Sequence, residues 1–201
     1  MALSVLQRNL AEYDRDTIAL FLDRSLQEVA RLEYLLKALK NYSLFEKPVM
    51  QKLPVAGFLV DFTALIRNDF ENHHIKIQRI VPESSLHVLA DSRALHHVLL
   101  NLITNAADAL SGCLNPQITI SAQEYAGEVQ IKVDDNGKGI SETEQQNLFK
   151  PFFTSKATGT GLGLVIVKKM LLAMNGRITV ESYQGMGTTV TLTLPKVGEN
   201  D

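Results

Sequence analysis

Four polar side chains fall on one side of a predicted helix over residues 91–110. They follow one another at intervals of four, four and three residues: His97, Asn101, Asn105 and Asp108. Asparagine is a poor helix former, so two asparagines in mid-helix indicate a use other than helix formation. Their amide oxygens are hard ligands of the kind that Mg²⁺ accepts beside waters and substrate phosphates. An ordinary solvated helix face is the alternative explanation.

A second polar segment, residues 134–139, follows a predicted strand over residues 128–133. Side chains alternate along a strand, so Asp135 should point inward with the apolar residues and Asp134 outward. An inward carboxylate is costly without a donor, and an adenine amino group would supply one. Two glycines would allow a tight turn and the close approach of a ligand: Gly137 and Gly139. An ordinary Asn-Gly turn is the alternative, whereas the ligand spacing excludes an EF-hand loop.

A third segment, residues 148–156, holds three of the eight phenylalanines and ends in a lysine. Core packing accounts for at least one of the aromatic rings. The proline and small polar residues predict a loop that the aromatic residues hold down. The ammonium of Lys156 could then act as a point charge for a phosphate.

A fourth segment, residues 158–164, is rich in glycine and opens a predicted helix over residues 162–174. Backbone N–H groups at a helix N-terminus form an anion site that suits phosphates. The segment lacks the lysine of a P-loop, and the third glycine of the dinucleotide pattern is replaced by Ile166. A second glycine pair at residues 185–187 fits a hairpin turn.

These segments need a scaffold of helices and strands, and the periodicity predicts both. Helices are expected at 55–71, 91–110 and 162–174, and strands at 75–80, 86–89, 117–121, 128–133, 177–182 and 188–194. The elements do not alternate strictly, which favours an α+β fold over a doubly wound one. We expect a two-layer α/β sandwich, a mixed sheet backed by helices, preceded by a long N-terminal helix.

That helix is predicted over residues 1–46, which contain neither proline nor glycine. Six apolar residues repeat at heptad spacing and form a seam that needs a partner: Ile18, Leu22, Val29, Leu32, Leu36 and Leu39. The partner could be the rest of the chain, a second copy or another helix. Because the helix should end before Pro48, residues 47–54 are predicted as a linker. Residues 55–196 form the main domain and 197–201 a tail.

Composition narrows the class of protein. The chain has 201 residues, a formal net charge of −2 and 45% apolar residues, which is ordinary for a globular protein and disfavours a general nucleic-acid binder. A single cysteine, Cys113, excludes a disulfide framework. No apolar run approaches the roughly 18 residues of a membrane span, and the first ten residues do not form a signal peptide. We expect a cytoplasmic chain, or the cytosolic part of something larger, without nucleic-acid or direct membrane contact.

Taken in order, the four segments resemble the N, G1, F and G2 boxes of sensor histidine kinases of two-component systems. These kinases share a superfamily with the gyrase, heat-shock chaperone and mismatch-repair ATPases. The resemblance covers about residues 50–195, with a looser match over 17–46 to the second helix of a dimerisation hairpin. The run Phe-Phe-Thr-Ser-Lys at 152–156 is similar to the subclass of nitrogen-regulation kinases.

The resemblance implies a Bergerat-type ATP-binding fold whose cofactors are ATP and Mg²⁺. Asn105 corresponds to the magnesium ligand and, with Lys156, to the catalytic residues; Asp135 corresponds to the adenine-binding carboxylate. Residues 155–161 correspond to the lid over ATP. Many members carry a basic residue where this chain has Asp108, which moves the phosphate role to Lys156. The full implied set for nucleotide is Asn101, Asn105, Asp135, Gly137, Gly139, Phe149, Phe153, Lys156, Gly159, Thr160, Gly161, Leu162, Gly163 and Thr188.

The same resemblance implies transfer of the ATP γ-phosphoryl to a histidine and then to the receiver domain of a response regulator. The family's phosphoacceptor helix is absent, because residues 1–46 contain no histidine. We therefore expect binding of ATP and ADP, a homodimer in the full-length protein, and no self-phosphorylation of this chain. A nucleotide-binding pseudokinase or scaffold is the alternative. A gyrase-like ATPase is disfavoured because Asn101 stands where that branch needs a carboxylate.

Overall fold

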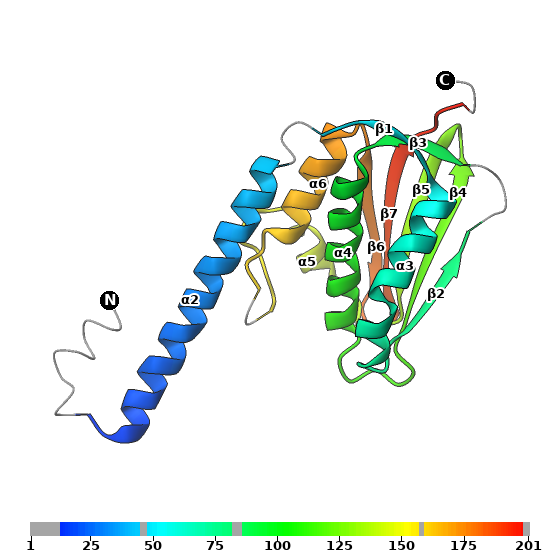
Figure 1. Ribbon diagram of the computed structural model, residues 1–201. Helices are drawn as coiled ribbons and strands as arrows, with labels where there is room; N and C mark the ends of the chain where they lie inside the picture. The colour runs from blue at the N-terminus through cyan, green and yellow to red at the C-terminus, as the bar shows by residue number, and fades with distance from the viewer. Residues whose placement is uncertain (1–12, 45–47, 82–85, 157–158, 199–201) are drawn as a thin grey trace.

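The computed structural model describes residues 13–44, with residues 30–44 by their backbone only, and residues 48–81, 86–156 and 159–198. Three helices cover one face of a sheet of five strands (Figure 1). The five strands are β2 Lys76–Ile80, β4 Gln117–Tyr125, β5 Glu128–Asp135, β6 Arg177–Tyr183 and β7 Gly187–Pro195. A second sheet consists of two strands, β1 Gln51–Pro54 and β3 His87–Ala90. The helices are α2 Arg15–Leu44, α3 Val55–Glu71, α4 Ser92–Ala109, α5 Glu142–Gln145 and α6 Gly163–Ala173.

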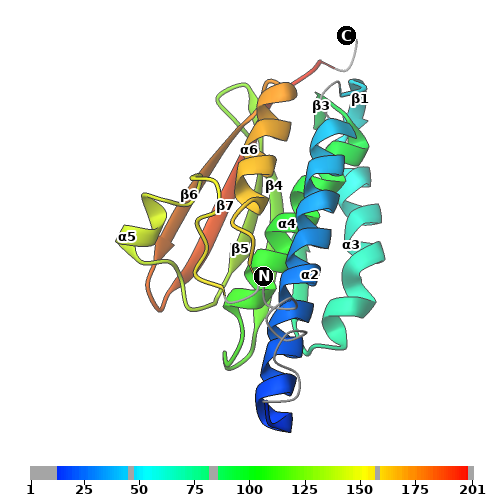
Figure 2. The same ribbon diagram turned by 90° about the vertical axis from the view of Figure 1, so that its left-hand side faces the viewer.

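The strand order of the main sheet is β2-β4-β5-β7-β6. β2 runs parallel to β4, whereas the other neighbouring pairs are antiparallel. α3, α4 and α6 lie together on one face of this sheet in both views (Figures 1 and 2). The mixed sheet backed by helices confirms the predicted α+β fold.

The core lies between α4 and the inner face of the sheet. The apolar face of α4 is fully buried, and so are the alternate residues of β4 and β5. Three of these side chains, Leu99, Ile120 and Ile131, have no exposed surface. Because α4 and β5 pack on each other through this core, the polar face of α4 and the end of β5 are held in fixed relation.

The predicted helix boundaries are close to those observed. Asp91 caps α4 as expected, since its carboxylate accepts hydrogen bonds from the backbone N–H groups of Arg93 and Ala94 at 2.9 and 3.3 Å. α6 ends at Ala173, and Met174 is its C-cap. Asn175 follows with a φ of 56°, and the N–H of Gly176 donates to the carbonyl of Leu171 at 2.7 Å. This is the left-handed termination that Asn-Gly predicts.

Two short elements were not predicted. β1 lies inside the range 47–54 and pairs antiparallel with β3, with Gln51 opposite Ala90. α5 begins at a capping box, in which Ser141 and Glu144 satisfy each other's backbone N–H groups. Both elements are four residues long, too short to show a clear period in the sequence.

The N-terminal helix α2 begins at Arg15, not at residue 1. Asp14 precedes it and accepts a hydrogen bond from the N–H of Thr17 at 2.8 Å. Residues 1–12, 45 and 46 of the predicted helix, and the seam side chains of Leu32, Leu36 and Leu39, lie outside what the structure describes. The end of α2 approaches α6, while most of its length stands away from the sheet (Figure 1).

Much of the described apolar surface of α2 is exposed. Leu22, Leu26 and Val29 expose 45%, 68% and 49% of their surface. The main domain therefore does not bury Leu22 and Val29 of the seam, nor the neighbouring Leu26. Among the described residues, no helix combines the length and apolar character that crossing a bilayer requires.

Candidate functional site

A cavity of about 490 Å³ lies between α4, α5 and the inner side of β5, β6 and β7. Its volume is in the range of small-molecule sites. Apolar side chains from several elements form much of its wall: Leu102, Val133, Ile140, Leu148, Phe153, Leu164, Val180 and Val190. Polar groups concentrate at two places, which we name the Asp135 end and the Lys156 end after their central residues.

At the Asp135 end, a carboxylate stands where β5 leaves the sheet. Asp135 lines the cavity, and its Oδ1 accepts a hydrogen bond from the N–H of Gly137 at 2.9 Å. Asp134 lies on the other face and accepts from the hydroxyl of Thr189 at 2.6 Å. The strand parity predicted from the sequence is therefore confirmed.

The environment of Asp135 disfavours its charged form. Burial raises the pKa of the Asp135 carboxyl, and backbone hydrogen bonds from Gly137 and Thr188 counter that rise only in part. Thr188 is opposite Asp135 in the β5–β7 register and also lines the cavity. A perturbed carboxyl in a cavity is typical of a ligand-binding group.

The turn that follows Asp135 is closely packed and leaves no room for a side chain at Gly139. Gly139 has a φ of 65°, and a Cβ at this position would overlap the carbonyl of Tyr183. The N–H of Lys138 donates to Ala109 at 3.1 Å, and the N–H of Gly185 donates to the carbonyl of Lys138 at 2.7 Å. The turn after β5 is thus fixed between the end of α4 and the β6–β7 turn.

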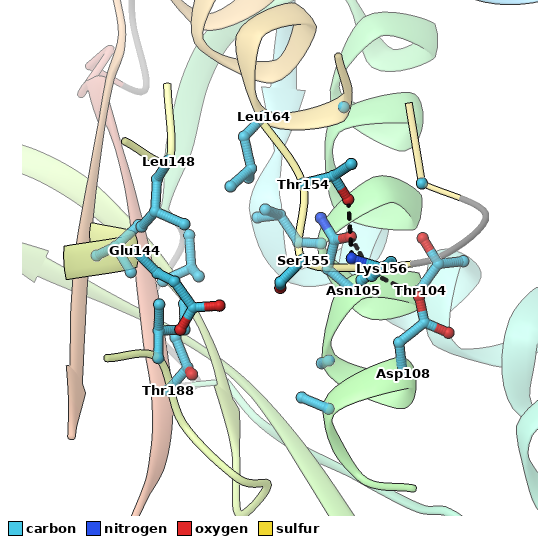
Figure 3. Close-up of a pocket in the computed structure, with 18 of the residues that line it drawn as sticks. Thr104, Asn105, Asp108, Glu144, Leu148, Thr154, Ser155, Lys156, Leu164 and Thr188 are labelled. Atoms are coloured by element: carbon cyan, nitrogen blue, oxygen red, sulfur yellow. Dashed lines mark hydrogen bonds and ion pairs between the residues drawn. The ribbon is translucent and has the colours of Figure 1, made fainter. Parts of the chain in front are cut away.

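At the Lys156 end, a lysine lies against the polar face of α4. The Nζ atom of Lys156 donates to Oδ1 of Asn105 at 2.8 Å and forms an ion pair with Oδ2 of Asp108 at 2.6 Å (Figure 3). Nδ2 of Asn105 donates to Oδ1 of Asn101 at 3.2 Å. All four side chains line the cavity, whereas His97, predicted on the same stripe, is not part of the wall.

The aromatic and glycine-rich segments meet beside this end. The N–H of Phe152 donates to the carbonyl of Gly161 at 3.1 Å. Both residues have positive φ, 65° and 66°, and a Cβ at Gly161 would overlap the backbone of Phe152 and lie 2.6 Å from the N of Phe153. The two segments therefore pack backbone to backbone.

The structure brings most of the predicted residues to the cavity. Phe153, Gly159, Thr160, Gly161 and Gly163 all line it. Three predicted residues lie outside the wall: Gly137, Phe149 and Leu162. Of these, Phe149 faces the ammonium of Lys168 at 5.1 Å, and Leu162 precedes the first residue of α6. Residues 157 and 158 of the predicted lid are outside the described ranges.

The N-terminus of α6 brings a further set of polar groups to the cavity, its first backbone N–H groups. No described side chain caps this helix, and Gly161 and Gly163 at its start line the cavity. N–H groups of this kind bind anions, and the anion site expected from the glycine pattern stays a prediction.

The predicted site omits two charged residues of the cavity wall, one in α5 and one in the turn after β5. Glu144 and Lys138 both line the cavity, and Figure 3 shows Glu144 across it from Lys156 and Asp108. Hydrogen bonds from Ser141 and Ser155 and the charge of Lys138 lower the pKa of Glu144. The Ser-x-x-Glu pattern at 141–144 is a capping-box signature and was the available signal.

The oxygen atoms at the Lys156 end are of the kind that hard divalent cations accept. The described residues contain no cluster of three or more histidine, cysteine, aspartate or glutamate residues. An ion bound here would therefore take few ligands from the protein, which fits Mg²⁺ with its waters and phosphate ligands. The oxygens of Asn105 and Asp108 already hold an ammonium, so this wall accommodates positive charge.

Comparison with known proteins agrees with this geometry. Residues 90–198 match the family model described as histidine kinase-, DNA gyrase B- and HSP90-like ATPase. The sensor histidine kinase ZraS of Escherichia coli is 37% identical over 131 residues, which are 65% of this chain and 28% of ZraS. The signal transduction histidine-protein kinase AtoS of the same organism is 31% identical over 176 residues, which are 87% of this chain and 29% of AtoS.

Solved structures give the same result. The catalytic domain of the histidine kinase ThkA superposes with a TM-score of 0.65 at 28% identity, over 73% of this chain and 95% of that domain. This chain spans less than a third of the length of the curated relatives. The family model covers more than half of the chain, and its matched residues include both ends of the cavity. The chain therefore belongs to the histidine kinase-, DNA gyrase B- and HSP90-like ATPase family.

Proposed function

We propose that this chain is the ATP-binding catalytic part of a two-component sensor histidine kinase, in the cytosol. It binds ATP with Mg²⁺ and transfers the γ-phosphoryl group to a histidine outside residues 1–201. Besides membership of the family, one structural observation supports this proposal. A single cavity joins a half-buried carboxylate, Asp135, to an amide oxygen that holds a positive charge, Asn105.

At the Asp135 end, we assign the recognition of adenine. Oδ1 of Asp135 is engaged by Gly137, and the raised pKa shows that its hydrogen bonds do not fully offset its burial. The exocyclic amino group of adenine is a donor that would complete this set. Apolar side chains such as Ile140 and Val190 line the same cavity and suit the faces of a flat ring.

At the Lys156 end, we assign the phosphates. Asn105 would hold the metal, with Asn101 orienting its amide group through the hydrogen bond at 3.2 Å. The ammonium of Lys156 and the N–H groups at the start of α6 would neutralise phosphate oxygens. Bound Mg²⁺ supplies neutralisation of charge on the transferred phosphoryl group. The protein's part is positioning, because phosphoryl transfer asks for little other chemistry from its side chains.

The acceptor histidine must come from elsewhere. None of the five histidines lines the cavity: His73, His74, His87, His96 and His97. His96 packs edge-on against Phe62 in α3, and His73 interacts with the backbone carbonyl of Asp69. Both contacts lie within the helical layer and away from the cavity wall, which supports an acceptor outside this chain.

We assign α2 to a dimer of the full-length protein. Its exposed apolar residues Leu22, Leu26 and Val29 need a cover, and a four-helix core with a second copy would supply it. The receiver domain of a response regulator is the proposed next acceptor of the phosphoryl group. A solved structure of ThkA holds the response regulator protein TrrA, which supports this choice of partner.

The test uses ATP labelled at the γ-position. Residues 1–201 should bind ATP by calorimetry yet carry no acid-labile, base-stable phosphate after incubation. Adding a histidine-bearing helix ahead of Arg15, so that the hairpin is complete, should restore labelling. The added histidine replaced by glutamine is the matched control and should abolish it.

Two results would contradict the assignment. Strong labelling at any of the chain's own five histidines would show that no outside acceptor is needed. Tight ATP binding without labelling of the completed hairpin would favour the pseudokinase alternative.

A further inference from the structure

Asp108 occupies an unfavourable place for a carboxylate. It lies in the last turn of α4, where the negative end of the helix dipole disfavours an acidic side chain. Its compensating charge comes from Lys156, 48 residues further along the chain. The cation on this face of α4 is therefore supplied by the lid and not by the helix.

The same lysine donates a hydrogen bond to the amide oxygen that a metal ion would need as a ligand. Nζ of Lys156 lies 2.8 Å from Oδ1 of Asn105, the atom assigned to Mg²⁺, whereas Oδ1 of Asn101 already accepts from Asn105. Mg²⁺ binds oxygen at about 2.0–2.1 Å and tolerates little distortion. An ammonium and a divalent ion at one amide oxygen would also repel each other. Lys156 must leave Asn105 before the metal is held there.

We propose that Asp108 is a positioning residue that holds Lys156 on α4 in the empty protein and competes with nucleotide phosphates for its ammonium. This inference rests on the proposed function, because the phosphates are the competing anion. Asp108 thereby limits the affinity for nucleotide in the absence of Mg²⁺. It does so by retaining the lysine and by adding its own negative charge next to the phosphate site.

Substitutions of the two partners should act in opposite directions. Asp108→Asn keeps the size of the side chain, frees Lys156 and removes one negative charge. The affinity for ATP without Mg²⁺ should rise by about threefold, the scale of an exposed ion pair. Lys156→Met removes the cation and should weaken the same affinity by about threefold. A merely structural ion pair would weaken binding in both variants.

The two effects should also depend on each other. In a Lys156→Met background there is no ammonium to release, so Asp108→Asn should give a smaller gain than in the wild-type protein. Asp108→Glu keeps the charge, so this variant should bind ATP with the same affinity as the wild-type protein. Asp61→Asn, an exposed carboxylate on α3, removes the same charge far from the cavity wall and should leave affinity unchanged.

The experiment has two arms. Calorimetry measures ATP binding to each variant in EDTA and in Mg²⁺, and the effect of Asp108→Asn should be larger in EDTA. Hydrogen exchange measures the lid without nucleotide. Peptides covering Ser155 and Lys156 should exchange faster than wild type in Asp108→Asn and in Lys156→Met. The double variant should exchange no faster than either single variant, because each single substitution already breaks the pair.

The outcomes separate this inference from the proposed function. Unchanged or weaker ATP binding by Asp108→Asn in EDTA, or lid exchange equal to that of wild type, would overturn the role of Asp108. If the wild-type chain bound no ATP in either condition, the proposed function would fail. The exchange arm would then still show whether Asp108 holds the lid.

Discussion

The two ends of the cavity are built in different ways. At the Asp135 end, the carboxylate is held by backbone N–H groups of Gly137 and Thr188, whose places follow from sheet register and a tight turn. At the Lys156 end, the partners are side chains, and Lys156 and Asp108 keep 40% and 59% of their surface exposed. One end is fixed by the main chain and the other by groups that can rotate.

The fixed Asp135 end is suited to recognising a ligand, whereas the movable side chains of the Lys156 end are suited to responding when a ligand binds. A half-buried carboxylate whose pKa is raised by burial costs stability in the folded chain, which makes Asp135 a candidate for binding a ligand. Exposed side-chain pairs are worth little to the fold and can exchange partners when a ligand enters. Substitutions at the Asp135 end should therefore alter stability and affinity more than those at the Lys156 end.

The largest effect is expected from an added methyl group. Gly139→Ala would drive a Cβ into the carbonyl of Tyr183 at positive φ, and should lower the free energy of unfolding by about 3 kcal/mol. Gly159→Ala at the Lys156 end first meets the Cβ of Lys156 and the side chain of Thr154, whose hydroxyl accepts a hydrogen bond from the N–H of Lys156 at 3.1 Å. The Thr154 side chain can rotate, so the cost should stay below about 1 kcal/mol.

Urea denaturation of the nucleotide-free protein measures both costs. Gly185→Ala is the control for backbone strain alone, because Gly185 has a φ of 80° but no atom within 4 Å of a built Cβ. It should cost about 1 kcal/mol. Equal losses for Gly139→Ala and Gly185→Ala would show that close packing is not what fixes the Asp135 end.

The next effect concerns nucleotide affinity. Asp135→Asn keeps the shape of the side chain but turns one acceptor oxygen into an amide donor facing the proposed adenine amino group. It should cost about 2 kcal/mol of ADP binding, roughly thirtyfold in Kd. Asp134→Asn, one residue away on the opposite face, should leave ADP affinity unchanged. If calorimetry finds the same ADP affinity for both variants, the assignment of adenine to the Asp135 end is wrong.

The smallest effect is on the pH dependence of stability without nucleotide. Burial raises the folded-state pKa of Asp135 above its ordinary value of 3.8. Between these two pKa values the folded state binds more protons than the unfolded one, so stability falls as pH rises through this window. Asp135→Asn removes that loss and should be at least as stable as wild type at pH 7, with the difference shrinking towards pH 4. A variant clearly less stable at pH 7 would contradict the sign.

The features predicted correctly depend on local rules. The direction of Asp135 follows from side-chain alternation in one strand, and the start of α4 follows from the capping preference of Asp91. Each rule needs only a few neighbouring residues. The fold class and the polar wall of α4 could therefore be read without any tertiary contact.

The features that were missed depend on contacts between distant segments. Lys156 was assigned to phosphate, but its partner in the empty protein, Asp108, is 48 residues away, and no periodicity links the two. β1 has four residues and exists because β3 pairs with it. The side of the cavity formed by α5 likewise depends on Gln145, whose side chain donates to the carbonyl of Ser182 at 2.8 Å.

The carboxylate that caps α4 has a practical consequence for shortened forms of the protein. Oδ2 of Asp91 also accepts a hydrogen bond from the N–H of Val49 at 2.9 Å, and Asp91 is 2% exposed. A recombinant fragment cut at residue 55 would remove both this donor and the strand that covers β3. A fragment beginning at Met50 would keep the strand but remove the N–H of Val49, so that Oδ2 of Asp91 would keep only the guanidinium of Arg93, at 3.1 Å, as a donor. Expression trials should therefore start the fragment at or before Pro48.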